Sequence, residues 1–276
     1  MMRSLWTAAS GMRAQQVNVD TIANNVANIN TISYKSQQAS FKSLLYQNLQ
    51  STSTNNAGEN KPVAAEVGLG SRVAAITSTF TQGNLTHVEN PFSVALEGDG
   101  FFQIRTESGE LQYTRDGSFE ISPVANGNML CTSDGNPVLD AYGNQIILPS
   151  NRVATDLVVN QDGTLAFPDG TGNPAVITDA NGRPVKFGIY QFNNPAGLSK
   201  EGSNNYSVTV ASGAAVAENG NAAVKQTKTH QYYTEASNVD VANEMVNLIV
   251  AQRAYEMNSK AIQASDEMMQ QANALR

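Results

Sequence analysis

The sequence has little charge and a single cysteine, and both shortages exclude classes of protein. Because Cys131 is the one cysteine among 276 residues, no disulfide can form within the chain, which excludes a disulfide-stapled scaffold. Charged residues make up 15% of the chain, whereas soluble domains average about a quarter. The formal net charge is −7, without any basic cluster. Since phosphate binding requires clustered Lys and Arg, we expect no nucleic-acid partner.

Long hydrophobic runs are also missing. No window approaches the roughly 18 consecutive apolar residues of a membrane-spanning helix, so we expect no membrane span. Residues 1–6 are not followed by an apolar segment with a small-residue cleavage site, so we expect no cleaved secretory signal. If the protein is exported from the cytoplasm, we therefore expect an export route that does not depend on a cleaved signal peptide.

The residue patterns of catalytic and metal-binding sites are absent as well. The two histidines, His87 and His230, each lack a second histidine at ligand spacing, which favours surface or packed side chains over metal ligands. Cys131 has no CxxC partner, and a buried, inert thiol is the better interpretation. HExxH, Walker-loop and GxSxG patterns do not occur. We therefore predict no catalytic residues, no metal, no cofactor and no enzymatic activity.

The first thirty residues carry apolar side chains at alternating three- and four-residue steps, interrupted only at Gln15. No proline breaks this heptad pattern, which predicts a helix from about Ser4 to Asn28. The seam residues of this helix are Leu5, Ala8, Met12, Val19, Ile22, Val26 and Ile29.

The last forty residues repeat the heptad pattern and predict a second long helix. Its predicted start is Ser237-Asn238, because either side chain can cap free backbone amides. Asp240 and Glu244 then lie near the positive end of the helix dipole. The seam residues of this helix are Val241, Met245, Leu248, Tyr255, Ile262 and Met269.

Two long helices at opposite ends of a chain most simply pack as an antiparallel pair, and the heptads predict a coiled coil. A two-helix coil in water should have a charged exterior, yet small or apolar residues occur on further faces of both helices. These residues are Ala9, Ala14, Ala23, Ala27, Ala251, Ala254, Ala261, Ser265 and Met268. We interpret these faces as buried against further copies of the chain; packing onto the chain's own β domain is the alternative.

The middle of the chain has the period-two pattern of β-strands, as in the alternation of Phe92, Val94 and Leu96. Asn-Gly and Asp-Gly pairs separate the strands and suit tight hairpins, and they lack the spaced aspartates of calcium loops. The predicted fold class is α+β, with a helical coiled-coil pair and a central, mainly antiparallel β domain. Residues 51–62 form a polar, low-complexity loop. The predicted domains are 1–30 with 238–276 for the helices, 31–75 with 211–237 for a connecting segment, and 76–210 for the β domain.

Several short segments of the chain form recognisable motifs. They are, in order, Ala23–Thr31, Ser33–Lys35, Gln82–Leu85, Glu97–Phe102, Tyr113–Phe119, Glu235–Asp240 and Gln252–Glu256. These segments resemble the signatures of the flagellar rod–hook family and follow one another in the family's order. Ser33 stands where the family usually has glycine, which argues against a positive-φ turn there. The motif residues that we take from these segments are Asn24, Asn25, Asn28, Gly98, Gly100, Phe101, Phe102, Arg253 and Tyr255.

The resemblance implies a structural role. It implies terminal helices that form an inner coiled-coil domain, a β domain outside it, and helical stacking into a hollow drive shaft that transmits torque to the hook. Length and both chain ends are most similar to the distal-rod members, and another rod or hook subunit is the alternative within the family. The implied location is the flagellar basal body, after export across the inner membrane to the periplasm or cell wall. The implied partners are further copies of the chain, proximal rod proteins, the hook protein, the type III export apparatus and the L and P rings.

We predict that the heptad seams carry assembly. The predicted interface residues are Leu5, Met12, Val19, Ile22, Val26, Ile29, Val241, Met245, Leu248, Tyr255, Ile262 and Met269. Two functions from other classes stay open. A secreted glycan-binding or adhesin module would present a sugar platform, made of Tyr113, Phe119, Tyr142 and Tyr190. A wall-degrading enzyme would use paired carboxylates such as Glu97, Asp99 or Asp116, although turn positions explain the two aspartates.

Overall fold

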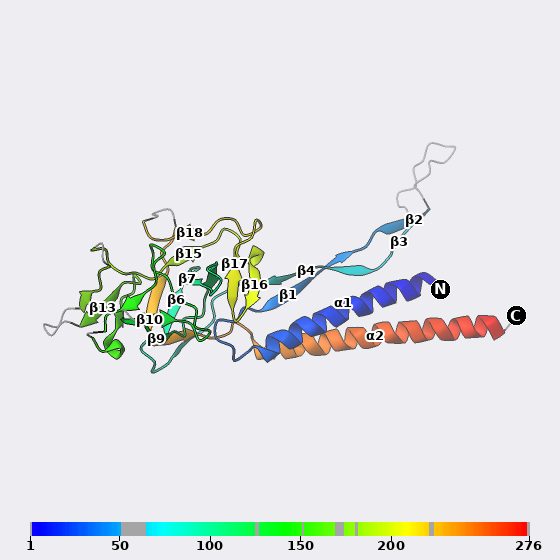
Figure 1. Cartoon of the computed structure of the whole chain (residues 1–276). Coiled ribbons are helices and arrows are strands. Elements are labelled where there is room, and N and C mark those ends of the chain that lie inside the picture. The colour runs from blue at the N-terminus through cyan, green and yellow to red at the C-terminus, as the bar shows by residue number, and fades with distance from the viewer. Residues whose placement is uncertain are drawn as a thin grey trace. The chain divides into compact units, whose positions relative to one another are not determined.

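The computed structural model describes residues 2–50, 65–124, 127–150, 152–168, 174–179, 182–220 and 224–274. The chain forms two compact units, each assembled from separate stretches of sequence (Figure 1). The helical unit comprises Met1–Ala27, Gln37–Thr79 and Asp240–Arg276, and the β unit comprises Asn28–Ser36 and Phe80–Val239. The predicted loop at 51–62 lies outside the described residues, and the predicted connecting segment at 31–75 with 211–237 stays a prediction.

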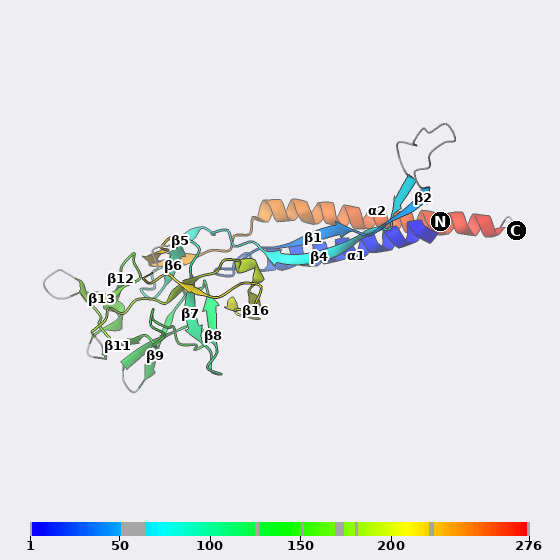
Figure 2. The ribbon, with the colours of Figure 1, turned by 90° about the horizontal axis from the view of Figure 1, so that it is seen from above.

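Two long helices dominate the helical unit. The first, α1, spans Met2–Ala27, and the second, α2, spans Val241–Ala274. They lie side by side and run antiparallel, so that the beginning of α1 and the end of α2 lie at the same end of the pair (Figure 2). The heptad pattern predicted a helix from about Ser4 to Asn28, and both observed ends of α1 lie within two residues of that prediction.

Small side chains line the contact between α1 and α2. The hydroxyl oxygens of Ser4 and Ser265 are 3.2 Å apart. A Cβ added to Gly11 would lie 3.0 Å from the side-chain amide of Asn258, and Ala251 is buried. These contact side chains are short, whereas larger apolar side chains of α2 such as Ile249 and Met257 are more than half exposed.

Two antiparallel strand pairs complete the helical unit, and α1 packs against the first pair. Asn25 of α1 fixes this contact, because its side-chain nitrogen donates to the Gln37 carbonyl and its oxygen accepts from the Gln37 amide, both at 2.8 Å. The same nitrogen donates to Glu244 Oε1 of α2 at 2.9 Å. The strands are β1 (Gln37–Ser43) with β4 (Ser71–Ser78), and β2 (Tyr46–Gln50) with β3 (Ala65–Gly68).

The β unit is built from short strands, and every strand pair described in it is antiparallel. Its largest sheet has six strands, in the order β16 (Ser199–Gly202), β17 (Asn205–Ser207), β8 (Leu111–Thr114), β7 (Phe101–Arg105), β15 (Ile189–Gln191) and β18 (Val216–Ala217).

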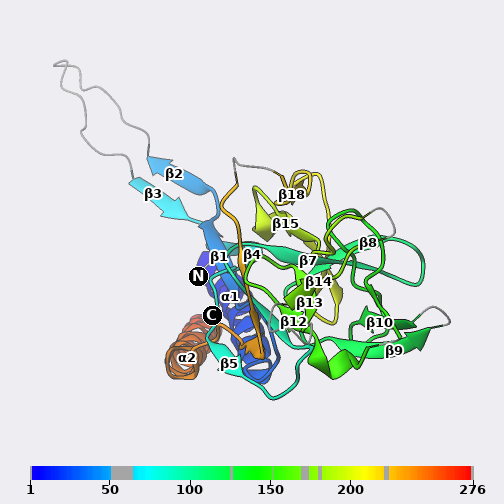
Figure 3. The same cartoon turned by 90° about the vertical axis from the view of Figure 1, so that its left-hand side faces the viewer.

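Four smaller sheets and two short 3-10 helices complete the β unit (Figure 3). The three-stranded sheets are β11 (Ile147–Leu148), β10 (Gly127–Cys131) and β9 (Glu120–Val124), and β12 (Val158–Val159), β13 (Leu165–Pro168) and β14 (Pro174–Val176). The strand pairs are β19 (Lys228–Gln231) with β6 (Val94–Glu97), and β20 (Tyr233–Glu235) with β5 (Leu85–His87). The 3-10 helices are Ala154–Asp156 and Pro195–Gly197.

Aromatic side chains on strand β7 divide the interior of the β unit into two clusters. Phe102 contacts Phe119 and Phe187 edge to face in the larger cluster, while Phe101 contacts Phe192 in the smaller one. Successive residues of a strand point to opposite faces, so neighbouring phenylalanines serve separate cores. The alternating pattern around 92–104 therefore predicted a buried β domain correctly.

The observed fold confirms the α+β class with a mainly antiparallel β domain. Turns with positive φ occur at Gly135 and Gly163, as their Asp-Gly pairs predict. The apolar segment 185–192, which its pattern predicts to be a strand, forms only the short strand Ile189–Gln191. The segment 211–223, whose small residues and glycines predict a loop, contains strand β18. Asp169-Gly170 lies outside the described residues. None of the helices in the described part of the chain is long and apolar enough to cross a membrane.

The predicted start of the C-terminal helix at Ser237-Asn238 is wrong. Helix α2 begins at Val241, and Asp240 caps it, because Asp240 Oδ1 accepts the Ala242 amide at 3.0 Å. All three candidate residues are good caps. Asn238 is engaged elsewhere, in a polar cluster within the β unit.

Candidate functional site

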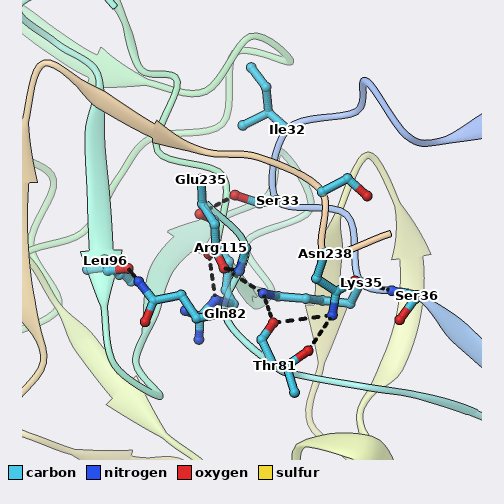
Figure 4. Close-up of polar contacts among 12 residues, drawn as sticks. Ile32, Ser33, Lys35, Ser36, Thr81, Gln82, Leu96, Arg115, Glu235 and Asn238 are labelled. Atoms are coloured by element: carbon cyan, nitrogen blue, oxygen red, sulfur yellow. Dashed lines mark hydrogen bonds and ion pairs between the residues drawn. The ribbon is translucent and has the colours of Figure 1, made fainter. Parts of the chain in front are cut away.

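Segments from five of the recognised motifs meet in one polar cluster of the β unit, whose charged side chains are buried (Figure 4). We call it the Glu235 cluster. Its central members lie far apart in sequence but close in space, and Gly98 is the one member that was among the predicted motif residues. They are Ser33, Lys35, Ser36, Thr81, Gln82, Gly83, Gly98, Arg115, Glu235 and Asn238.

The carboxylate of Glu235, at the end of β20, is the centre of the cluster. Its Oε1 accepts from Lys35 Nζ at 2.6 Å and from the Gly83 amide at 2.9 Å. Its Oε2 accepts from Arg115 Nε at 3.0 Å. The side chains of Lys35 and Glu235 are 0% exposed, so these are charge-assisted bonds shielded from water.

The two cations of the cluster also bind backbone carbonyls. Lys35 Nζ donates to the Thr81 carbonyl at 2.8 Å, and the Arg115 guanidinium donates to the Gly98 carbonyl at 2.8 Å. The guanidinium lies over the Phe101 ring, 5.5 Å from its centroid. Arg115 thereby ties the cluster to β7 and β8, the central strands of the largest sheet.

The charges set the protonation of the cluster. Burial alone would raise the pKa of Glu235, but the charges of Arg115 and Lys35 outweigh it, and the pKa lies below the ordinary value of 4.5. Burial lowers the pKa of the Lys35 ammonium, the charge of Arg115 lowers it further, and Glu235 opposes both effects. The short Lys35–Glu235 bond fits an ammonium and a carboxylate. Nearby, burial raises the pKa of Tyr206 to about 12.

Ser33 adopts the left-handed backbone conformation, with a φ of 57°, so the expectation against a positive-φ turn there is wrong. Two hydrogen bonds offset this strain, and glycine could make only the one from the backbone amide. The Ser33 hydroxyl donates to the Arg115 carbonyl at 2.8 Å, and its amide donates to the Glu235 carbonyl at 2.8 Å. The side chain is completely buried. Burial and two bonds therefore hold a conformation that costs about 1 kcal/mol or more for a residue with a Cβ.

Asn238, the second-last residue of the β unit in sequence, also belongs to the cluster. Its Oδ1 accepts from the Ser36 amide at 2.7 Å, and its Nδ2 donates to the Thr81 hydroxyl at 2.9 Å. These bonds explain why Asn238 does not cap α2. Every charged group of the cluster has partners, and the described residues contain no group of three or more His, Cys, Asp or Glu that could hold a metal. The bonds of the cluster join chain segments that lie far apart in sequence.

The predicted assembly residues lie at different depths. Ile22 is buried at 5% exposure, whereas Val241, Met245 and Tyr255 are exposed. Half-buried positions are Leu5, Met12, Val19, Val26, Leu248, Ile262 and Met269 in the helical unit, and Ile29 in the β unit. Val19 and Tyr255 line one groove of the helical unit, together with Gln16, Gln252 and Glu256.

A second exposed apolar strip on α2 was largely missed by the seam prediction. It contains Val246 at 59% exposure, Ile249 at 58% and Met257 at 66%, with Val250 and Met268 also exposed. By helical periodicity, Ile249 lies roughly opposite the contact residues Ala251 and Ser265, whereas Met257 and the rest of the strip lie on a flank of α2. The signal was present in the sequence as apolar residues outside the heptad seam.

Comparisons with known proteins agree with the order of the motifs. A family model described as "Flagella basal body rod protein" matches residues 5–35. The "Flagellar hook protein FlgE/F/G D1 domain" matches 95–167, and the "Flagellar basal body rod FlgEFG protein C-terminal" matches 230–275.

Full-length relatives decide the family. The chain is 42% identical to the flagellar basal-body rod protein FlgG of Borreliella burgdorferi, covering 100% of this chain and 99% of the relative. It is 37% identical to FlgG of Caulobacter vibrioides, with 100% of both chains covered, and 34% identical to FlgG of Bacillus subtilis, with 98% of both covered. The chain belongs to the flagellar basal-body rod protein family. As a member, it is a structural subunit of the flagellar rod in the basal body, not an enzyme.

The rod-family motif residues serve the packing of both units. Phe101 and Phe102 fill the two cores, and a Cβ at Gly100 would lie 2.5 Å from Ile189 Cγ2. Gly98 has a φ of 138°, a conformation that favours glycine. Among the remaining motif residues, Asn25 is buried, Asn28 is half-buried, and Asn24, Arg253 and Tyr255 are exposed.

The residues behind the other functional hypotheses have structural roles in this rod-family chain. Tyr113 and Phe119 are buried, so they do not form an exposed sugar platform with Tyr142 and Tyr190. Asp116 accepts the Ser118 amide at 2.9 Å in a turn.

The structure also shows the surroundings of the two histidines and of the cysteine. His87 is exposed, and His230 lies 2.7 Å from Glu97. Cys131 is buried, and burial raises the pKa of its thiol, as the interpretation of a buried thiol predicts.

Proposed function

We propose that the chain is a distal-rod subunit that polymerises through its helical unit into a hollow helical shaft, which transmits torque to the hook. One observation carries the proposal, namely the apolar strip on α2 that its own chain leaves exposed. Val246, Ile249 and Met257 each expose more than half of their surface. Apolar burial stabilises association by roughly 25 cal/mol per Å², so a neighbouring copy that covers this strip gains a large driving force.

The close packing of α1 on α2 supports this use of the strip. The short contact residues Ser4, Gly11 and Ser265 hold the pair together, and the bulkier apolar residues of α2 remain available to other copies. We propose that neighbouring helices pack there knobs into holes, as a coiled coil. Trp6, at 74% exposure on α1, provides a further apolar contact of the same kind.

A contact between different faces of identical subunits generates an open helical filament when its rotation does not close. The α2 strip and the rest of the helical unit are different faces, which fits such a contact. The proposed partners are further copies of this chain, proximal rod proteins on one side, the hook protein on the other, and the L and P rings around the shaft. We further propose export through the type III apparatus without a cleaved signal.

The seam residues enter the proposal as assembly contacts to the extent that they are accessible. Met245 and Tyr255 are exposed and free to meet another copy, whereas Ile22 is buried within its own unit. A charged residue at Ile22 would disturb the α1–α2 pair itself. The outer strip therefore provides the cleaner test of assembly.

The test is Met257→Glu in the full chain, with Gln263→Glu as a matched control that adds the same charge at an exposed polar position of α2. We expect the Met257→Glu chain to fold as a monomer, to form no rod in electron micrographs of basal bodies, and to leave cells without hooks. The control should assemble. Normal rods built from the Met257→Glu chain would contradict the proposal.

A further inference from the structure

The chain passes between the two units four times, after residues 27, 36, 79 and 239. Three of these crossings begin or end beside the Glu235 cluster. Lys35 and Ser36 precede the crossing after 36, Thr81 and Gly83 follow the crossing after 79, and Glu235 with Asn238 precedes the crossing after 239.

Each of these three crossings is bonded to the other two. Lys35 binds both the Glu235 carboxylate and the Thr81 carbonyl. Asn238 binds the Ser36 amide and the Thr81 hydroxyl. Figure 4 shows these bonds as one continuous set around the Lys35 ammonium and the Asn238 amide.

We propose that the Glu235 cluster is a mechanical clamp, which ties three chain crossings to one another and to the largest sheet of the β unit. Force that arrives along one crossing is then shared among all three. Arg115 provides the attachment to the sheet, because it directly follows β8, lies over the Phe101 ring of β7 and binds Glu235. The mechanical role rests on the proposed function as a torque-transmitting rod subunit, while the linkage itself is a property of the single chain.

The chemistry of the cluster fits positioning better than stabilisation. Desolvating buried charges is costly, and replacing a buried ion pair by apolar residues of similar volume is often neutral or stabilising. The three charged side chains carry a formal net charge of +1, since Lys35 and Arg115 face one Glu235 carboxylate. What charged groups provide here is directional bonds from segments up to 200 residues apart in sequence.

Hydrogen exchange of backbone amides in the full chain tests the clamp. The deciding amide is that of Ser36, because its acceptor is Asn238 rather than Glu235. In Glu235→Gln, we expect exchange at both Ser36 and Gly83 to accelerate by more than about a hundredfold, the factor that corresponds to the lower end of the cost of breaking a buried ion pair. The core amide of Leu130, which donates to Ile146 at 3.1 Å, reports the loss of stability of the whole β unit, so it should accelerate less than Ser36.

Two further variants separate linkage from charge. Lys186→Met removes the lysine of an exposed ion pair in the same unit, Lys186–Asp162, and should leave exchange unchanged. The double variant Lys35→Met with Glu235→Gln restores the formal charge of +1 but lacks the ammonium link to Thr81. The clamp predicts that Ser36 stays unprotected in the double variant.

Several outcomes would overturn the clamp. They are unchanged protection of Ser36 in Glu235→Gln, protection restored in the double variant, or equal acceleration at Ser36 and Leu130. If Glu235→Gln does not fold, the single variant Lys35→Met tests the clamp instead, again by comparing amide exchange at Ser36 with that at Leu130. A wild-type chain that fails to build rods would contradict the proposed function but not these exchange results, so the two failures are distinguishable.

Discussion

The two units of the chain bury their apolar side chains in opposite ways. In the β unit, aromatic and aliphatic residues such as Phe102 and Leu130 are almost completely buried in two clusters. In the described part of the helical unit, the buried hydrophobic residues are Ala8, Ala14, Ile22 and Ala251, and only Ile22 is larger than alanine. Larger apolar residues of the helical unit, including Val246 and Met257, are exposed.

The β unit of this chain can therefore be stable by itself, while the helical unit leaves apolar surface for neighbouring copies to cover. A closed aromatic core stabilises the β unit without help from other molecules. Apart from Ile22, the buried apolar residues described in the helical unit are alanines, so exposed side chains such as Val246 and Met257 gain burial only from other copies. The following predictions test this contrast, beginning with the largest expected effect on the stability of the single chain.

The strongest effect should follow from opening the β core. We expect Phe102→Ala to destabilise the β unit by about 3–5 kcal/mol, because it leaves a cavity between Phe119 and Phe187. Hydrogen exchange resolved by unit should show the loss in the β unit, with α1 and α2 amides unchanged. Equal loss in both units would show that they do not fold independently.

The next effect depends on pH and on the buried charges of the β unit. At pH 7, Glu235→Gln should cost about 3 kcal/mol, since two buried cations lose their carboxylate. The folded pKa of Glu235 lies below 4.5, so its contribution is complete above that value and is lost as the pH falls through the folded pKa.

Urea titrations of the two proteins at a series of pH values measure this effect. The difference in unfolding free energy between wild type and Glu235→Gln should be constant near neutrality and shrink in acid. A difference that grows toward low pH would contradict the assignment of a charged Glu235 in the folded state.

The helix cap should contribute less. Asp240→Ala removes the acceptor of the Ala242 amide, and we expect a loss of about 1 kcal/mol that is confined to the first turns of α2. Asp240→Asn keeps an acceptor oxygen and should recover most of the loss. Exchange at the amides of 242–245 measures both. An effect of Asn238→Ala in place of Asp240→Ala at these amides would restore the predicted, more N-terminal start of the helix.

Some elements of the fold could be predicted from the sequence, and others could not. Periodicity predicted α1 and the alternating β core, because regular burial leaves a regular pattern of apolar residues. Strands β1 and β4 were missed because they are mostly exposed, and their sequence carries little alternation. The start of α2 was missed because three capping residues compete within four positions, and tertiary bonds to Ser36 and Thr81 occupy one of them.

The Glu235 cluster was missed for a different reason. Most of its members come from motifs that were recognised, but each residue taken alone suggests a surface charge or a turn. Only the fold shows that Lys35 and Glu235 meet, since 200 residues separate them. The strained backbone at Ser33 was likewise not predictable from a single residue type, because its conformation is held by Arg115 and Glu235.

The smallest effect on the single chain is the most informative about the helical unit. Ile249 is 58% exposed on α2, so Ile249→Ala should change the stability of the monomer by less than about 0.5 kcal/mol. The same substitution at Ile22, which is buried in the same unit, should cost at least about 2 kcal/mol. Chemical denaturation of dilute chains, monitored by exchange in α1 and α2, measures both. If Ile249→Ala destabilised the monomer as much as Ile22→Ala, its side chain would already be buried within one copy, and the helical unit would not need neighbours.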